Sequence, residues 1–305
     1  MADTLAVATL GPVAGGTIMA QDIEAAATAY TDYLGYQVTH RGAISEAMTG
    51  TWATPAHAGA ASLIMTPASG EPHWIRFIEA EPVAGYKPLT SYGWHSLEIV
   101  VADVDAIPPT LEGSPFTIVG DPKNLGGGSS IRAMQVRRGD GGEVLYLTQI
   151  PDAPEKAHLP LAKSFIDRIF IVVLGSPNMN EARAYYVDTF GLEPGMEAPA
   201  MIRVTNDAFG LPAGSEHVIC TVKMPGKCLI EIDDYPKQAK PRPKAEGSLP
   251  PGIAMISFAT ADIGALGLPL LAPAAAIDGA PYDGRRAAIT IGAAGEMIEL
   301  IESAR

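Results

Sequence analysis

Short runs in which apolar and polar residues alternate recur along the whole chain, and such alternation predicts β-strands with one buried face. The runs WHSLEIVV (94–101) and VLYLTQ (144–149) are clear examples. The pattern predicts strands at about 36–41, 60–66, 73–80, 93–101, 115–119, 131–137 and 143–149, and again at about 165–173, 200–205, 216–223, 228–233, 252–260, 286–291 and 296–302. Helical spacing occurs mainly at about 22–34 and 179–190.

The two predicted helices belong to a long internal repeat. AAATAYTDYLGYQV (25–38) matches NEARAYYVDTFGLEP (180–194), and GGEVLYLTQ (141–149) matches AGEMIELIE (294–302). The two matches have nearly the same offset, which indicates duplicated domains rather than a chance similarity. Between them lies a polar, proline-rich linker, IPDAPEKAHLPLAK. We therefore predict a first domain over residues 1–156 and a second over residues 157–305.

Each half combines many strands with few helices, so we predict an α+β fold. Strands and helices do not alternate regularly, as they would in a doubly wound parallel sheet. The 305 residues are also enough for two domains.

Charge and hydropathy narrow the classes of partner. The chain has 34 acidic and 21 basic residues, a net charge of −13, which disfavours binding to nucleic acid or to an anionic membrane. The sequence contains neither an apolar run long enough for a membrane span nor the pattern of a secretory signal. We expect a cytoplasmic protein.

The repeated segments resemble the vicinal oxygen chelate superfamily of glyoxalase I, bleomycin-resistance proteins and extradiol dioxygenases. The resemblance rests on a strand that runs into a helix with an aromatic pair and then LG or FG (21–36 and 178–192), and on the closing pattern G-E-x-x-E/Y-L. It implies four βαβββ modules, paired within each domain into two open β-sheet cups. It also implies a small-molecule site in the cups, where members usually hold a divalent metal with one residue from each of four strands.

The metal-facing positions can be carried over strand by strand. In the first domain they fall near Gly15, Arg76, Ser96 and Tyr146, and in the second near Asp167, Glu231, Met255 and Glu299. No histidine occupies any of them, so we expect no iron, zinc or nickel, which prefer imidazole ligands.

Strand alternation gives the first domain a polar and aromatic inner face that suits an organic ligand. The predicted ligand-binding residues on this face are Trp74, Arg76, Trp94, Ser96, Glu98 and Thr148, beside Tyr146. The alternation puts His95 on the opposite, core-facing side. A one-residue bulge would reverse that assignment.

The second domain keeps two family carboxylates, Glu231 and Glu299. Crowded carboxylates in a partly dry cup can take up a proton, bind a cation together, or form buried ion pairs with arginine or lysine. Magnesium, manganese or calcium would take an oxygen site formed by Asp167, Glu231 and Glu299. A raised pKa would instead suit proton transfer. We take Glu231, Glu299 and Tyr146 as the candidate catalytic residues, and favour no metal.

These observations favour a small-molecule enzyme, a lyase or isomerase that moves a proton on a carbonyl-bearing or aromatic compound. The alternative is a binding protein that sequesters its ligand, like the bleomycin-resistance members. A metal-dependent dioxygenase or glyoxalase is the third hypothesis. Substrate identity, the active cup and the existence of a homodimer stay open.

Overall fold

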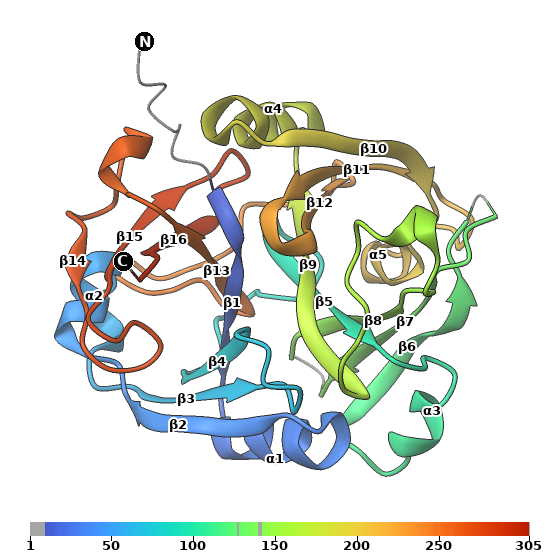
Figure 1. The fold of residues 1–305 in the computed structure, drawn as a ribbon, viewed down its shortest axis with the longest axis horizontal. Coiled ribbons are helices and arrows are strands. Elements are labelled where there is room, and N and C mark those ends of the chain that lie inside the picture. Colours follow the sequence, from blue (N-terminus) through green and yellow to red (C-terminus); the bar gives the residue numbers. More distant parts are fainter. Residues whose placement is uncertain (1–9, 127, 140–141, 305) are drawn as a thin grey trace.

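A computed structural model describes residues 10–126, 128–139 and 142–304. Its strands form two eight-stranded sheets, each curled around its own interior (Figure 1). The curvature of each sheet creates a cup, as the resemblance implies, and the many strands with few helices confirm the α+β fold. No helix in the described part of the chain is long and apolar enough to cross a membrane.

Four successive modules supply the strands. The first contains β1 (Leu10–Ala20), α1 (Ile23–Leu34), β2 (Gln37–Ala43), α2 (Glu46–Trp52), β3 (Ala61–Thr66) and β4 (Trp74–Glu79). The second contains β5 (Gly93–Val101), α3 (Ile107–Thr110), β6 (Phe116–Asn124), β7 (Arg132–Arg138) and β8 (Val144–Gln149). The third contains β9 (Ile166–Ser176), α4 (Met179–Phe190), β10 (Glu193–Ala200), α5 (Arg203–Phe209), β11 (His217–Met224) and β12 (Cys228–Asp234). The fourth contains β13 (Ile253–Thr260), β14 (Ala275–Ala276), β15 (Arg286–Ile291) and β16 (Met297–Glu302).

The modules do not pair in the order that the sequence repeat suggests. One sheet has the order β14-β15-β16-β13-β1-β4-β3-β2, which joins the first and fourth modules, and we call its concave side the terminal cup. The other has the order β10-β11-β12-β9-β5-β8-β7-β6, which joins the second and third modules, and we call its concave side the central cup.

The expectation that each half of the chain closes its own cup is therefore wrong. The physical reason lies in the backbone pairing: β1 runs antiparallel to β13, and β5 runs antiparallel to β9. The linker between β8 and β9 lies between the two modules of one sheet, so a division after residue 156 does not separate the cups. The domain assignment 1–156 and 157–305 stays a prediction from the repeat.

The repeated helices are formed by local signals that the two halves share. Asp22 caps α1 by accepting from the Ala25 backbone N–H, and Asn178 caps α4 by accepting from that of Glu181. Both helices end at a glycine in the left-handed region, Gly35 at φ 69° and Gly191 at φ 64°.

The glutamate of each G-E pattern fixes these helices to the following module of the same half. The hydroxyl of Tyr30 donates to Glu143 at 2.8 Å, and that of Tyr186 donates to Glu296 at 2.7 Å. All four side chains are buried, and burial raises the pKa of Glu296 to about 7. The repeated aromatic and acidic residues thus have a structural role, which explains why both motifs recur together.

One predicted strand, at 200–205, is wrong. The strand in this region is β10, which ends at Ala200, and residues 203–209 form the short helix α5, which Gly210 ends at φ 64°. Val204 of α5 packs against the side chains that line the central cup, so tertiary contacts stabilise the helix.

Candidate functional site

The terminal cup is filled by the protein's own side chains around a buried ion pair. Arg76 on β4 contacts Glu299 on β16 at 3.2 Å, and the two side chains are 1% and 0% exposed. Glu299 also accepts from the indole N–H of Trp52 at 2.8 Å and from the hydroxyl of Tyr282 at 2.6 Å. The hydroxyl of Ser257 completes its partners.

The guanidinium of Arg76 is equally well satisfied. It donates to the hydroxyls of Thr17 at 3.0 Å and Tyr282 at 2.8 Å. The rings of Trp52, Trp74 and Tyr282 surround it, with centroids 4.6, 5.1 and 5.7 Å from its central carbon. Such cation–π contacts are favourable where water is excluded.

The pair formed by Arg76 and Glu299 makes the terminal cup unsuitable for a metal ion. The resemblance implies a metal at the positions of Arg76 and Glu299, but the fixed positive charge of Arg76 does not fit a second cation. Three predicted site residues, Arg76, Trp74 and Glu299, thus belong to one internal network. The open alternative of a buried ion pair is the observed one for Glu299.

The central cup has a different polar lining. Glu98 on β5 pairs with Tyr146 on the neighbouring strand β8. On the other side of β5, Ser96 pairs with Val173 of β9, and Val173 in turn pairs with Glu231 of β12. Side chains two residues apart share a face, so Thr148 and Asp233 lie on this concave side too. The structure therefore brings together five of the residues that the sequence singled out, namely Ser96, Glu98, Tyr146, Thr148 and Glu231.

A bulge in β5 adds His95 to this lining. Trp94 pairs with Leu174 and Ser96 with the adjacent Val173, so one extra residue is inserted between them. As a result, His95 contacts the ring of Tyr146, at 6.5 Å between centroids, and lies in the cup. The assignment of His95 to the core side is wrong.

The same bulge turns Trp94 away from the cup. Its ring packs against Phe258 and Tyr186 in the core between the sheets, with centroids 6.1 and 6.5 Å apart, and its N–H donates to the Met297 carbonyl at 2.8 Å. The prediction that Trp94 lies on the ligand-facing side with Ser96 and Glu98 is therefore wrong.

A hydrogen-bonded chain connects β5 to β12. The Nδ1 atom of His95 lies 3.0 Å from the Ser96 hydroxyl, and its Nε2 atom lies 3.1 Å from Oδ2 of Asp233. Burial, followed by the positive charge of Arg242, lowers the pKa of His95 to about 3, so the imidazole is neutral. A neutral His95 donates from one ring nitrogen and accepts at the other, so it holds Ser96 and Asp233 in fixed orientations.

The three carboxyl groups of the central cup hold protons more tightly than exposed ones do. Burial, followed by the charge of Glu231, raises the pKa of Glu98 to about 8, although the Thr148 hydroxyl donates to it at 2.6 Å. Burial and the neighbouring Asp233 raise the pKa of Glu231 well above its usual range, and burial also raises that of Asp233. Glu231 is partly exposed, whereas Glu98 and Asp233 are buried.

Several buried polar atoms of this cup have no hydrogen-bond partner within the described ranges. They are the hydroxyls of Tyr146 and Tyr235 and the Oδ1 atom of Asp233. Buried polar groups are normally satisfied, so such a group of atoms on one concave face is characteristic of a site that meets a ligand.

Helix α5 and the loop before β5 cover the central cup, as Figure 1 shows for the helix. A pocket of about 260 Å³ lies at this cover, next to Val144, two residues before Tyr146 on β8. Its lining combines apolar side chains with a few charged ones, namely Lys87, Pro88, Leu89, Val119, Arg137, Val144, Val204, Asp207 and Ala208.

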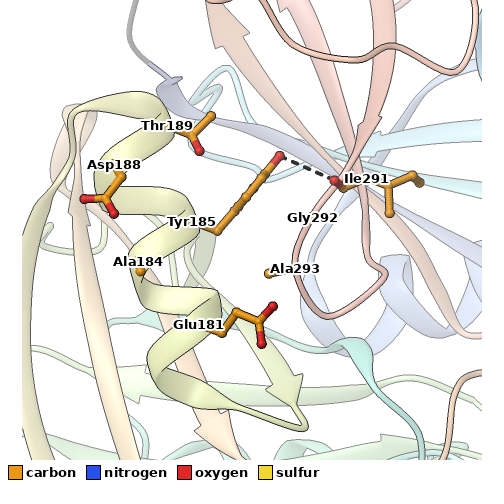
Figure 2. Close-up of a pocket in the computed structure, with 8 residues that line it drawn as sticks. All are labelled: Glu181, Ala184, Tyr185, Asp188, Thr189, Ile291, Gly292 and Ala293. Atoms are coloured by element: carbon orange, nitrogen blue, oxygen red, sulfur yellow. Dashed lines mark hydrogen bonds between the residues drawn. The ribbon is translucent and has the colours of Figure 1, made fainter.

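A second pocket, of about 430 Å³, lies outside both cups, between α4 and the turn at 291–293 (Figure 2). The Tyr185 hydroxyl reaches across it to the Ile291 carbonyl at 3.4 Å. Glu181 and Asp188 project from the same helix. None of the predicted site residues lines it.

The residues named for an oxygen-ligated metal are not together. Asp167 lies near the start of β9, where it accepts from the Ser69 hydroxyl and from the Lys163 backbone N–H at 2.7 Å. Glu231 and Glu299 belong to different cups. Within the part of the chain that the structure describes, no three His, Cys, Asp or Glu side chains are arranged to hold a metal ion. Asp167, Glu231 and Glu299 therefore do not form the oxygen-ligated site that the resemblance implies.

The stability of the protein should fall as the pH rises from about 5 to 9. The folded pKa of Glu98, about 8, exceeds its ordinary value of 4.5, so its contribution is complete below pH 4.5 and disappears through about pH 8. Each pKa unit corresponds to about 1.4 kcal/mol, so the total is a few kcal/mol. Urea titrations of the wild type and Glu98→Gln measure it. The variant should lose less stability over this range, and an equal loss in both proteins contradicts the assignment.

No family model matches the sequence, and no curated protein matches it. Two solved structures are similar over nearly the whole chain. Glyoxalase I from Zea mays matches with a TM-score of 0.63 and 13% identity, over 95% of this chain and 92% of its own. A protein provisionally assigned as a dioxygenase, from Bacillus subtilis subsp. subtilis str. 168, matches with a TM-score of 0.63 and 13% identity, over 98% and 87%. The chain therefore has the fold of the glyoxalase and dioxygenase superfamily, as its repeated motifs predict.

Proposed function

We propose that the protein is a small-molecule enzyme, a lyase or isomerase, that moves a proton on a carbonyl-bearing compound in the central cup. The observation that carries this proposal is the position of the partly exposed Glu231, on the concave face that also holds Asp233 and the Tyr146 hydroxyl, which has no partner among the described residues. Burial and Asp233 raise the pKa of Glu231. A carboxylate that binds a proton tightly is a stronger base, and proton transfer is most efficient when its pKa lies near the working pH.

In the proposed reaction, ionised Glu231 removes a proton from the carbon next to the substrate carbonyl. The electron pair of the broken C–H bond moves to the carbonyl oxygen, which becomes an enolate oxygen. The Tyr146 hydroxyl, which is buried and has no partner in the described residues, donates a hydrogen bond to this oxygen. Return of the proton to a different carbon gives an isomer, and departure of a β-substituent gives a lyase product.

The neighbouring groups would keep Glu231 in the right state. Asp233 raises its proton affinity, and His95, which also contacts Ser96, holds the Asp233 carboxyl in place. Helix α5 covers the cup and limits the entry of water, which strengthens these electrostatic effects.

Hydrogen exchange on carbon tests the proposal without knowledge of the product. A panel of ketones, aldehydes and amino ketones is incubated with the protein in D₂O, and the loss of each α-proton signal is followed by NMR. We expect at least one compound to exchange faster than in buffer, and Glu231→Gln to abolish that acceleration. If compounds bind but none exchanges, the sequestering protein becomes the better hypothesis.

A further inference from the structure

We infer that the central cup takes a small organic cation, and that Asp233 and Tyr235 hold its ammonium or guanidinium group. The inference deepens the proposed function by giving the substrate class, and it rests on that function only for the position of the reacting carbonyl. It stands on a comparison between the two cups and on the buried atoms of the central one.

The terminal cup shows what this kind of lining binds. Arg76, Tyr146 and Glu299 are each the third residue of a six-residue strand, β4, β8 and β16, that pairs in parallel with the first strand of its own module. In the terminal cup, a guanidinium stands at this position and meets a carboxylate, a tyrosine hydroxyl and aromatic rings. In the central cup, Tyr146 stands there instead.

The central cup has the acidic and aromatic partners without the cation. None of the ion pairs found among residues 10–126, 128–139 and 142–304 joins Glu98, Glu231 or Asp233 to an arginine or lysine. Arg242 approaches from the segment before β13, but it donates to the carbonyls of Trp94 and Ile253, at 2.6 and 2.8 Å, and to the Ser91 hydroxyl. Three crowded carboxyl groups whose pKa values are raised have no cationic partner among these residues, and a positively charged ligand would stabilise their ionised form.

The unpartnered atoms locate the charged group of the ligand. Oδ1 of Asp233 and the hydroxyl of Tyr235 are buried and have no partner in the described residues. The ring of Tyr235 lies over Gly175, where a side chain would clash with it, and it contacts the rings of His95 and Phe209, at 5.3 and 5.8 Å. A carboxylate oxygen beside aromatic rings is a typical environment for an alkylammonium group.

The spacing along β12 connects this site to the proposed chemistry. Glu231 and Asp233 are two residues apart on one strand face, so their Cα atoms are about 6.6 Å apart. Their carboxyl groups are close enough to interact directly. An amino ketone carries its charged nitrogen on the acidic carbon, so it can meet Asp233 with the nitrogen and Glu231 with the C–H bond. A divalent metal is the less suitable occupant, because two of the three unpartnered atoms are neutral phenols.

Calorimetry with three probes tests the charge preference. Benzylamine, benzyl alcohol and benzoate share one ring but are cationic, neutral and anionic at neutral pH. We expect benzylamine to bind the full-length protein roughly tenfold or more tightly than either of the others, since a charge-assisted contact has about this effect. Equal or tighter binding of benzoate overturns the inference.

Variants locate the site and provide the controls. Asp233→Asn should weaken benzylamine roughly tenfold and Tyr235→Phe less, while Glu155→Gln, which removes an exposed linker carboxylate, should leave affinity unchanged. Far-UV circular dichroism verifies that each variant is folded. Wild-type affinity in both site variants, or displacement of benzylamine by Mn²⁺ in a one-to-one manner, shows that the inference is wrong.

The outcomes separate this inference from the proposed function. Benzylamine binding that depends on Asp233, without carbon exchange on any compound, contradicts only the enzyme proposal. Exchange that depends on Glu231 but occurs only on neutral or anionic compounds contradicts only the cation site.

Discussion

Arg76→Met is expected to lower the free energy of unfolding by about 3–5 kcal/mol, the usual result of removing one partner of a buried ion pair. Methionine fills much of the space but leaves the carboxylate of Glu299 buried without its cation. The remaining donors, from Trp52, Ser257 and Tyr282, are neutral and compensate only in part. Chemical denaturation of the variant and wild type at pH 7 measures the loss.

Two comparisons make this result specific. Arg286→Met removes the partner of Glu302 on the same sheet, where the arginine is 49% exposed, so it should cost about 1 kcal/mol or less. The double variant Arg76→Met/Glu299→Gln should recover part of the loss, because it replaces the stranded charge by an amide. A loss no larger than that of Arg286→Met would show that Arg76 does not stabilise the terminal cup.

Glu231→Gln is expected to reduce turnover about 10²-fold or more, the scale associated with loss of a general acid or base. Glutamine keeps the size of the side chain but cannot accept the substrate proton. Rates are measured on whichever compound shows accelerated carbon exchange, with affinity determined separately. Ligand binding should change much less than the rate.

The matched variant is Glu299→Gln, at the corresponding strand position of the other cup. It should destabilise the protein, because it weakens the pair with Arg76, but the folded fraction should retain its turnover. Tyr146→Phe should reduce turnover less than Glu231→Gln and preserve folding. If Glu299→Gln abolishes the reaction in folded protein while Glu231→Gln does not, the reacting cup has been misassigned.

Strand alternation predicts most of the concave lining correctly, because side-chain facing depends on a period of two. It places Glu98, Tyr146 and Thr148 on one side, as observed. Asp233 could also have been found, since it follows Glu231 by two residues in LIEID. The bulge between Trp94 and Ser96 could not have been predicted. One inserted residue changes the side of the sheet that the side chains face, and it leaves no signal in the composition.

The pairing of modules is harder to predict than their existence. A repeat identifies similar units in the chain. The number of residues between repeated segments does not depend on which units share a sheet, so it does not show how they pair. Each cup is therefore assembled from residues that the sequence assigns to different halves, such as Arg76 with Glu299 and Tyr146 with Glu231. The two carboxylates therefore have different partners. Glu299 meets the guanidinium of Arg76, whereas Glu231 lies beside Glu98 and Asp233.

The nested pairing of modules also imposes an order on folding during synthesis. The second and third modules are neighbours in the chain, so β5 and β9 can pair as soon as both are made. Thr17 of β1 must instead wait for Met255 of β13, which is made much later. Until then the apolar edge of β1 has no antiparallel partner, and such an edge is prone to intermolecular pairing. Closure of this late, long-range contact is an entropically costly step, so we expect the first module to be the last to complete its sheet.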